Sequence, residues 1–153
     1  PNRIFTRPMI SLLQRVSHAS VSVDGAVTGS IGRGLLVFLA VQPEDSETTL
    51  ARMVERVLTY RIFPDEADRM NRSVLEEQLE LLVVPQFTLA ADTRKGTRPS
   101  FTRAASPTIA ARYFQDFLTE CRERLTTVES GVFGANMKVS LLNDGPVTFW
   151  LEA

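Results

Sequence analysis

The chain is poor in the side chains on which most enzymes rely. His18 is its only histidine and Cys121 its only cysteine. A Ser-His-Asp triad would need His18, yet no Gly-x-Ser-x-Gly segment is present to hold a nucleophilic serine. No Cys/His cluster offers zinc ligands, and Gly29, Gly32 and Gly34 lack the spacing of a phosphate-binding loop. The sequence therefore predicts neither a metal nor a cofactor.

Two polar side chains, Gln86 and Thr88, follow directly on a predicted buried strand, Leu79–Val84. Functional groups are commonly presented where a strand of the scaffold ends, so both are candidates for a site. Periodicity alone favours a plainer interpretation, in which Thr88 belongs to a strand that continues to Ala91.

A second candidate is the pair Gly145-Pro146, which follows Asn143-Asp144. The pattern favours a hairpin turn between two predicted strands, Met137–Leu142 and Val147–Leu151. A glycine before a proline also permits a cis peptide bond or a backbone carbonyl aimed at a ligand. We expect Trp150, on the second of these strands, to lie in the core.

The net charge of −1 gives no global sign of nucleic-acid binding, but residues 93–115 contain no acidic side chain. The basic residues of this window are Arg94, Lys95, Arg98, Arg103 and Arg112. Such a cluster could neutralise several phosphates of a nucleic acid. An ordinary solvated loop and helix face would carry the same charges.

Most of the remaining chain is assigned to strands and helices by its apolar pattern. The strands predicted in the first half are Ile10–Val16, Ala19–Val23, Val27–Ile31 and Leu35–Val41, with a tight turn at Asp24-Gly25. A helix is predicted over Ser46–Ile62 and a polar loop over Pro64–Ser73. Ser106-Pro107 opens a second helix, whose apolar stripe includes Cys121 as a packing residue.

Strands in hairpins with two main helices predict an α+β fold of layered β-sheets, mixed or antiparallel. The length of 153 residues, with 44% hydrophobic and 23% charged side chains, suits one globular domain. We assign residues 1–8 to an N-terminal extension and residues 9–153 to that domain. No stretch approaches the roughly 20 apolar residues of a membrane span. Because one cysteine fits a reducing compartment, we expect a cytoplasmic protein.

Several segments together resemble the D-aminoacyl-tRNA deacylase family. Gln86-Phe87-Thr88-Leu89-Ala90-Ala91-Asp92 matches the first signature of that family, and Asn143-Asp144-Gly145-Pro146-Val147-Thr148-Phe149 is similar to the second. Further matching segments are Ser11–Val16, Gly34–Val37, Tyr60–Phe63, Arg98–Phe101 and Ala105–Pro107. The resemblance runs in order from about residue 9 to residue 151, so it is far more specific than any single motif.

The resemblance implies a proofreading hydrolase that cleaves the ester between tRNA and a D-amino acid, or glycine mischarged on tRNA-Ala. It implies a homodimer with active sites at the interface, where Gly145-Pro146 of one subunit enters the pocket of the other. A cis bond in this pair would direct carbonyls that exclude L-side chains by steric conflict. The resemblance also assigns Arg15 to the orientation of the pair and Met137 to support of the site.

In the same family, the backbone N–H groups of Phe87 and Thr88 would hold the ester carbonyl as an oxyanion hole, with Gln86 beside them. Thr88 has also been viewed there as a nucleophile. A threonine hydroxyl needs an adjacent base to attack at neutral pH, and the sequence shows none near Thr88. We therefore favour positioning by Thr88 and attack by water, assisted by the terminal 2′-hydroxyl of the tRNA.

Pro85 departs from the family pattern, because the first signature usually begins with serine. A related, chirality-relaxed branch carries Pro-Gln-x-Thr-Leu there, has a trans Gly-Pro bond and removes L-alanine from mischarged tRNA. Phe87 and Val147-Thr148 look like the D-specific branch, so the isomer of the Gly145–Pro146 bond separates the two. A further alternative is a non-catalytic tRNA-binding module. The candidate tRNA contacts are Arg94, Lys95, Arg98 and Arg103.

Overall fold

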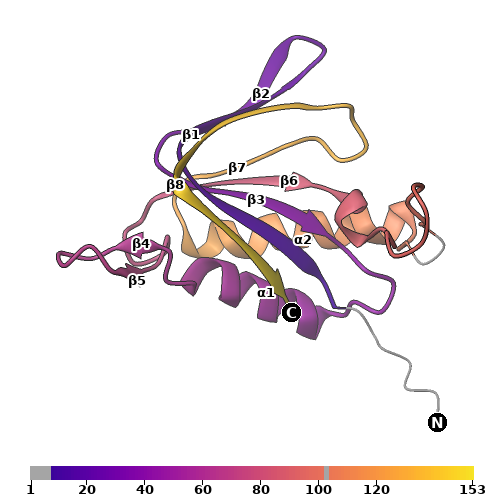
Figure 1. The fold of residues 1–153 in the computed structure, drawn as a ribbon, viewed down its shortest axis with the longest axis horizontal. Coiled ribbons are helices and arrows are strands. Elements are labelled where there is room, and N and C mark those ends of the chain that lie inside the picture. The colour runs from indigo at the N-terminus through magenta and orange to yellow at the C-terminus, as the bar shows by residue number, and fades with distance from the viewer. Residues whose placement is uncertain (1–7, 102–103) are drawn as a thin grey trace.

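The computed structural model describes residues 8–101 and 104–153, and most of its strands belong to one large sheet (Figure 1). The elements are β1 (Ile10–Val23), β2 (Ala26–Ile31), β3 (Gly34–Ala40), α1 (Glu47–Thr59), β4 (Phe63–Pro64), β5 (Met70–Arg72), β6 (Glu80–Pro85), the 3₁₀ turn η1 (Phe87–Ala90), α2 (Pro107–Arg124), β7 (Val128–Ser130) and β8 (Lys138–Glu152). The predicted α+β class with two main helices is confirmed.

The six strands of the sheet follow the order β2-β1-β3-β6-β7, and β8 pairs with β1 outside this path. Strand β1 is antiparallel to β2, β3 and β8, whereas β3–β6 and β6–β7 are parallel. Parallel neighbours need a crossover connection, and α1 lies in the one between β3 and β6. The two strands therefore end at the same edge, where Leu39 pairs with Pro85.

The two helices cover one face of this sheet and pack against each other (Figure 1). Ser46 caps α1 through a capping box with Thr49, and Ser106 caps α2 ahead of Pro107. Their buried stripes consist of Leu50, Met53, Val54, Val57 and Leu58 on α1 and of Phe114, Phe117, Leu118 and Cys121 on α2. Helix periodicity thus placed both helices correctly, with α1 ending three residues before the predicted Ile62.

A buried carboxylate joins the start of β1 to the start of α1. Asp45 accepts hydrogen bonds from the backbone N–H of Met9 at 2.8 Å, the N–H of Gln42 at 2.7 Å and the hydroxyl of Thr49 at 2.8 Å. Burial raises the pKa of this carboxyl, because desolvation outweighs the three hydrogen bonds that favour its charge.

One continuous strand, β1, replaces the two that were predicted over residues 10–23. The expected break near His18 is an irregularity in the pairing with β8, between Val16 and His18. Such a shift changes which side chains face the core, so the apolar alternation is interrupted although the strand is not.

The prediction of a hairpin at Asn143–Pro146 is also wrong, because β8 runs through these residues and both of its halves pair with β1. Val16 lies opposite Asn143, and Gln14 lies opposite Thr148. Arg15 alone therefore faces residues 144–147, which form a wide bulge.

Three smaller predictions also differ from the structure. The predicted polar loop contains β5 and the second residue of β4. Strand β7 was not predicted, because it is three residues long and ends in a serine. Trp150 is 48% exposed rather than buried, because it alternates with the buried Leu151 and so lies on the outer face of β8.

Candidate active site

The segment after β6 is a 3₁₀ turn rather than the strand that periodicity favoured. The N–H of Gln86 donates to the carbonyl of Leu39 at 2.9 Å, which fastens the turn to β3. The N–H of Leu89 then donates to the carbonyl of Gln86 at 3.3 Å. Because the hydrogen bonds within a 3₁₀ turn run back three residues, the N–H groups of Phe87 and Thr88 have no carbonyl partner inside the turn.

Pro85 fits this position without loss of a sheet bond. The pairing of β6 with β7 ends at Val83 and Ser130, two residues before Pro85. The N–H of Gln86 points to β3, so the neighbouring Pro85 nitrogen faces the side on which the ladder has already stopped.

The hydroxyl of Thr88 is exposed and accepts a hydrogen bond from the amide Nε2 of Gln86. An amide donor cannot remove a proton, and no other side-chain partner of Thr88 is found among the described residues. His18 is exposed on β1, where it pairs with Leu142 of β8, and does not line the cavity next to Gln86. Among the residues that the structure describes, Thr88 therefore has no side chain beside it that could act as a general base.

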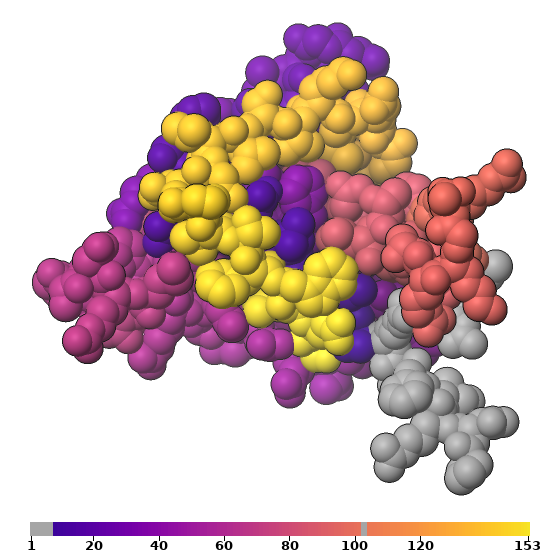
Figure 2. All heavy atoms as spheres, viewed as in Figure 1, coloured from indigo at the N-terminus to yellow at the C-terminus, as the bar shows by residue number. Residues whose placement is uncertain are grey.

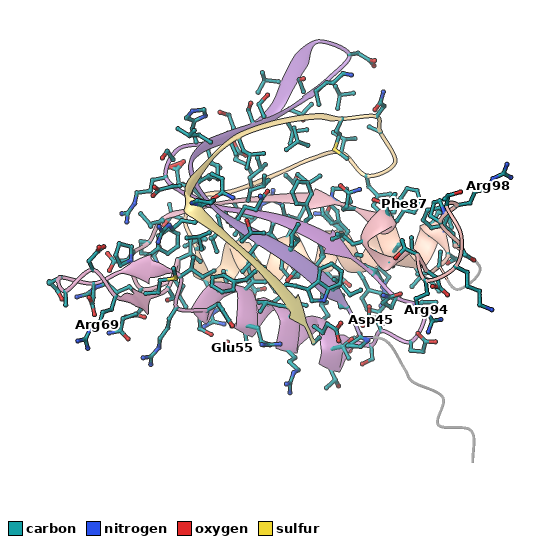
Figure 3. The ribbon with its side chains drawn as sticks, in the orientation of Figure 1. Asp45, Glu55, Arg69, Phe87, Arg94 and Arg98 are labelled. Atoms are coloured by element: carbon teal, nitrogen blue, oxygen red, sulfur yellow. The ribbon has the colours of Figure 1, made fainter. Side chains whose placement is uncertain are left out.

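Next to this turn lies a largely apolar cavity of about 670 Å³, at the common edge of β3 and β6. Its walls include Val41 from the end of β3, Gln86 and Phe87 from the turn, Phe114 from α2 and Met137 from just before β8. The rings of Phe87 and Phe101 lie 5.2 Å apart. Phe87 is 65% exposed and is labelled in Figure 3. A flat, uncharged group with few polar atoms fits such walls best.

Gly145 and Pro146 lie exposed on the bulge of β8 and are joined by a cis peptide bond, the isomer expected of the D-specific branch. Arg15 holds the bulge from β1, because its Nε donates to the carbonyl of Asp144 at 3.0 Å and its Nη1 to the carbonyl of Ile62 at 2.9 Å. Gly145 has φ +138°, and a Cβ there would come within 2.6 Å of the Val147 side chain. Glycine is required at this position.

Side-chain amides on both sides of the bulge fix its ends. The Oδ1 of Asn143 accepts from the N–H of Val147 at 2.8 Å, and its Nδ2 donates to the hydroxyl of Thr148 at 3.0 Å. Gln14 also donates to that hydroxyl, at 3.4 Å. The bulge is thus closed by its own side chains and by Arg15, so it forms a defined projection rather than a loose loop.

The structure does not bring the two halves of the predicted site together within one chain. Gln86, Phe87 and Met137 line the cavity, whereas Gly145, Pro146 and Arg15 do not. Figure 1 shows the bend in β8 at the left end of the sheet and the turn after β6 at its right end.

The basic window is less uniformly positive than its sequence indicated. Arg94 forms a two-point ion pair with Asp92, with Nε–Oδ1 at 3.0 Å and Nη2–Oδ2 at 2.9 Å. Lys95 and Arg98 are exposed, and Arg98 points outward from the loop (Figure 3). Arg103 lies outside the described residues. The window missed Asp92 because that acid stands one residue before it.

The described residues contain no cluster of His, Cys, Asp and Glu that could hold a metal ion. In the same part of the chain, no helix is long and apolar enough to cross a membrane.

Two pairs of aromatic rings that line the cavity were not predicted from the sequence. They are Phe87 with Phe101 and Phe114 with Phe133. Phe101 lies within the matching segment Arg98–Phe101 without being chosen as a site residue, and Phe133 carries no signal at all. Only the tertiary fold brings Phe101 next to Phe87 and Phe133 next to Phe114.

Comparisons with known proteins identify the family. A family model described as D-Tyr-tRNA(Tyr) deacylase matches residues 12–152. The D-aminoacyl-tRNA deacylase of Aliivibrio salmonicida is 57% identical over 144 residues, covering 94% of this chain and 99% of the relative. That of Actinobacillus succinogenes is 54% identical over 145 residues, covering 95% and 100%. The chain therefore belongs to the D-Tyr-tRNA(Tyr) deacylase family.

Solved structures agree on the fold. A structure named c-Myc DNA Unwinding Element Binding Protein superposes with a TM-score of 0.89 and 39% identity, covering 94% of this chain and 98% of that one. A second, described as a probable eukaryotic D-amino acid tRNA deacylase, has a TM-score of 0.85, covers 95% and 99%, and is 18% identical. The second likeness shows the fold alone.

Proposed function

We propose that this protein is a D-aminoacyl-tRNA deacylase, which hydrolyses the ester between a D-amino acid and the 3′-terminal ribose of tRNA. The observation that carries the proposal is the turn after β6, which presents two backbone N–H groups beside an apolar cavity and no basic side chain. The ribose oxygen of an ester leaves more readily than the nitrogen of an amide, so donors for the oxyanion and a positioned water can support hydrolysis without a side-chain nucleophile.

In this mechanism the N–H groups of Phe87 and Thr88 bind the ester carbonyl oxygen and stabilise the negative charge that develops on it. Water attacks the carbonyl carbon, and its proton passes through the neighbouring 2′-hydroxyl of the terminal ribose to the ribose oxygen that leaves. The bond between carbonyl carbon and ribose oxygen then breaks, releasing free amino acid and tRNA. The side chain of Gln86 orients the Thr88 hydroxyl, which helps to place the water.

The protein acts as a homodimer in which Gly145-Pro146 of one copy completes the cavity of the other. Support comes from the exposed position of this pair and from its absence among the cavity walls of its own chain. Two carbonyls held by a rigid bulge leave no room for an L-side chain, but they admit a D-side chain or the hydrogen of glycine. Glycyl-tRNA formed on tRNA-Ala is accordingly a second substrate.

Aminoacyl-tRNA is used in the cytoplasm, and we place the activity of this protein there. Lys95 and Arg98 are the best candidates for its phosphates, because they are exposed whereas Arg94 is occupied by Asp92. Surface cations of this kind raise affinity for any tRNA and carry no information about the amino acid.

Parallel deacylation of D-Tyr-, L-Tyr-, Gly- and L-Ala-tRNA tests the function. We expect rapid release of D-tyrosine and glycine, with L-tyrosine retained. Release of L-alanine would instead favour the chirality-relaxed deacylase, to which Pro85 points. Binding of tRNA without release of any amino acid would favour a non-catalytic tRNA-binding module.

A variant at Thr88 tests the mechanism within this assay. Thr88→Val keeps the backbone N–H and removes the hydroxyl, so positioning predicts a loss of about tenfold in kcat, the size expected for one hydrogen bond of roughly 1.4 kcal/mol. Complete loss of single-turnover hydrolysis with tRNA binding intact would establish Thr88 as the nucleophile.

A further inference from the structure

A second hollow, of about 510 Å³, lies away from the cavity, where the end of α1 meets the β4–β5 pair and β8. It is lined by Arg56, Thr59, Tyr60, Arg61, Met70 and Phe149. Figure 2 shows the magenta surface of the β4–β5 pair meeting the yellow surface of β8 on this face. Nothing in the deacylase reaction described so far uses these residues.

Apolar and aromatic groups form part of the wall of the hollow. The rings of Tyr60 and Phe149 lie 5.6 Å apart at 57°, and Met70 is 49% exposed. The guanidinium of Arg56 lies 6.0 Å from the centre of the Tyr60 ring. A planar base could stack on such a surface, since every nucleobase has a π-face.

Two guanidinium groups lie beside the aromatic surface of the hollow, and neither forms an ion pair with a described carboxylate. Among residues 8–101 and 104–153, Arg56 donates to the backbone carbonyl of Glu152 and Arg61 donates to the side-chain carbonyl of Asn71 at 3.0 Å. The nearby acids have other partners, because Glu55 pairs with Arg124, and Asp65 accepts from Asn71 and from two backbone N–H groups. Arg56 and Arg61 thus retain their charge and have N–H donors left for an anion.

The hollow is also tied to the Gly145-Pro146 bulge. Phe149 stands three residues after Pro146 on β8. Arg15 donates to the carbonyl of Asp144 on the bulge and to the carbonyl of Ile62, directly after Arg61. Arg15 therefore connects the bulge to the chain segment that borders the hollow.

We propose that this hollow binds the single-stranded 3′ end of the tRNA whose terminal aminoacyl-adenosine occupies the partner's cavity. Arg56 and Arg61 contact its phosphates, and the Tyr60–Phe149 surface stacks one of its bases. Single-strand sites generally combine a basic groove with aromatic platforms, which is the chemistry present here. The inference rests on the proposed function, because it requires the bulge of one copy to lie at the cavity of the other.

The test compares three D-tyrosyl esters, of adenosine, of the trinucleotide CCA and of complete tRNA, in hydrolysis by the full-length protein. For Arg61→Gln and Arg56→Gln, we expect the KM for the CCA and tRNA esters, relative to the KM for the adenosine ester, to rise about three- to tenfold, as for one lost phosphate contact. Arg61→Lys keeps a charge and should restore most of the difference. Arg69→Gln, an equal charge change on an exposed neighbouring residue outside the hollow, is the matched control.

Equal KM changes for all three esters, or an equal effect of Arg69→Gln, would overturn the inference. The inference would also be overturned if the second copy of the protein covered the hollow. In that case replacing Arg61 would convert dimer to monomer. Binding of uncharged tRNA, with and without its CCA end, supplies an arm that needs no hydrolysis. If Arg61→Gln removes the gain in affinity that CCA provides, the hollow is an RNA site even when the wild-type protein releases no amino acid, and the proposed function alone fails.

Discussion

Replacing Arg15 by lysine tests how the Gly145-Pro146 projection is held. The Arg15 side chain is 13% exposed and donates to two carbonyls, those of Asp144 and Ile62, at 3.0 and 2.9 Å. Lysine keeps the charge but reaches only one of these carbonyls at a time. A hydrogen bond from a charged donor contributes about 1.5–3 kcal/mol, so Arg15→Lys should lower the free energy of unfolding by about that amount.

The same change should loosen the chirality gate. If half of the lost interaction energy had oriented the bulge against an L-side chain, the ratio of kcat/KM for D-Tyr-tRNA to that for L-Tyr-tRNA would fall by about three- to tenfold, since each 1.4 kcal/mol is a factor of ten. Urea unfolding gives the first quantity, and parallel deacylation assays give the second.

A control separates orientation from general stability. Arg72→Lys alters the last residue of β5, whose side chain pairs with Glu66 and Glu77 and forms no hydrogen bond or ion pair with the bulge among the described residues. It should leave the D/L ratio unchanged. If Arg15→Lys lowered stability but left the ratio at its wild-type value, Arg15 would only support the fold and the reasoning about the gate would fail.

Three further predictions concern other groups. Replacing Lys95 and Arg98 by alanine should weaken tRNA binding and reduce the slope of log affinity against log salt concentration. Arg94→Ala should change that slope little, because Asp92 already pairs with Arg94. Equal slopes for the two variants would contradict this prediction. Cys121 is fully buried with a pKa raised to about 12, so it should resist alkylation until urea unfolds the protein, and rapid labelling of the native state would refute its placement. The carboxyl of Asp45 has a folded-state pKa above its ordinary value of 3.8, so its contribution to stability is complete below pH 3.8 and is lost as pH rises through the folded pKa. The stability advantage of wild type over Asp45→Asn, measured by urea unfolding, should therefore shrink between acid and neutral pH.

Local signals were sufficient for the elements that depend on local physics. The helix stripes and the helix start at Ser106-Pro107 could be predicted because each involves neighbours within one or two turns. The Asp24-Gly25 turn could be predicted for the same reason, and both residues have positive φ.

Predictions failed where a distant strand decides the local conformation. Periodicity divided β8 at Asn143–Pro146, but the strand continues because β1 pairs with both of its halves. Thr88 was given to a strand, although the backbone turns where Gln86 bonds to Leu39 of β3. No local pattern distinguishes a bulge from a hairpin when both contain Asn, Gly and Pro.

The proposed chemistry explains why an inventory of side chains revealed so little. In the proposed mechanism, the oxyanion donors are the backbone N–H groups of Phe87 and Thr88, and the chirality gate consists of carbonyls on the Gly145-Pro146 bulge. Such groups occur at every residue, so only their placement makes them functional. That placement depends on Arg15 and Gln86, whose long-range and local hydrogen bonds hold the two backbone segments. Because the segments lie apart within one chain, the proposal makes selection against L-amino acids a property of a dimer, and it predicts hydrolysis without selection for a separated copy.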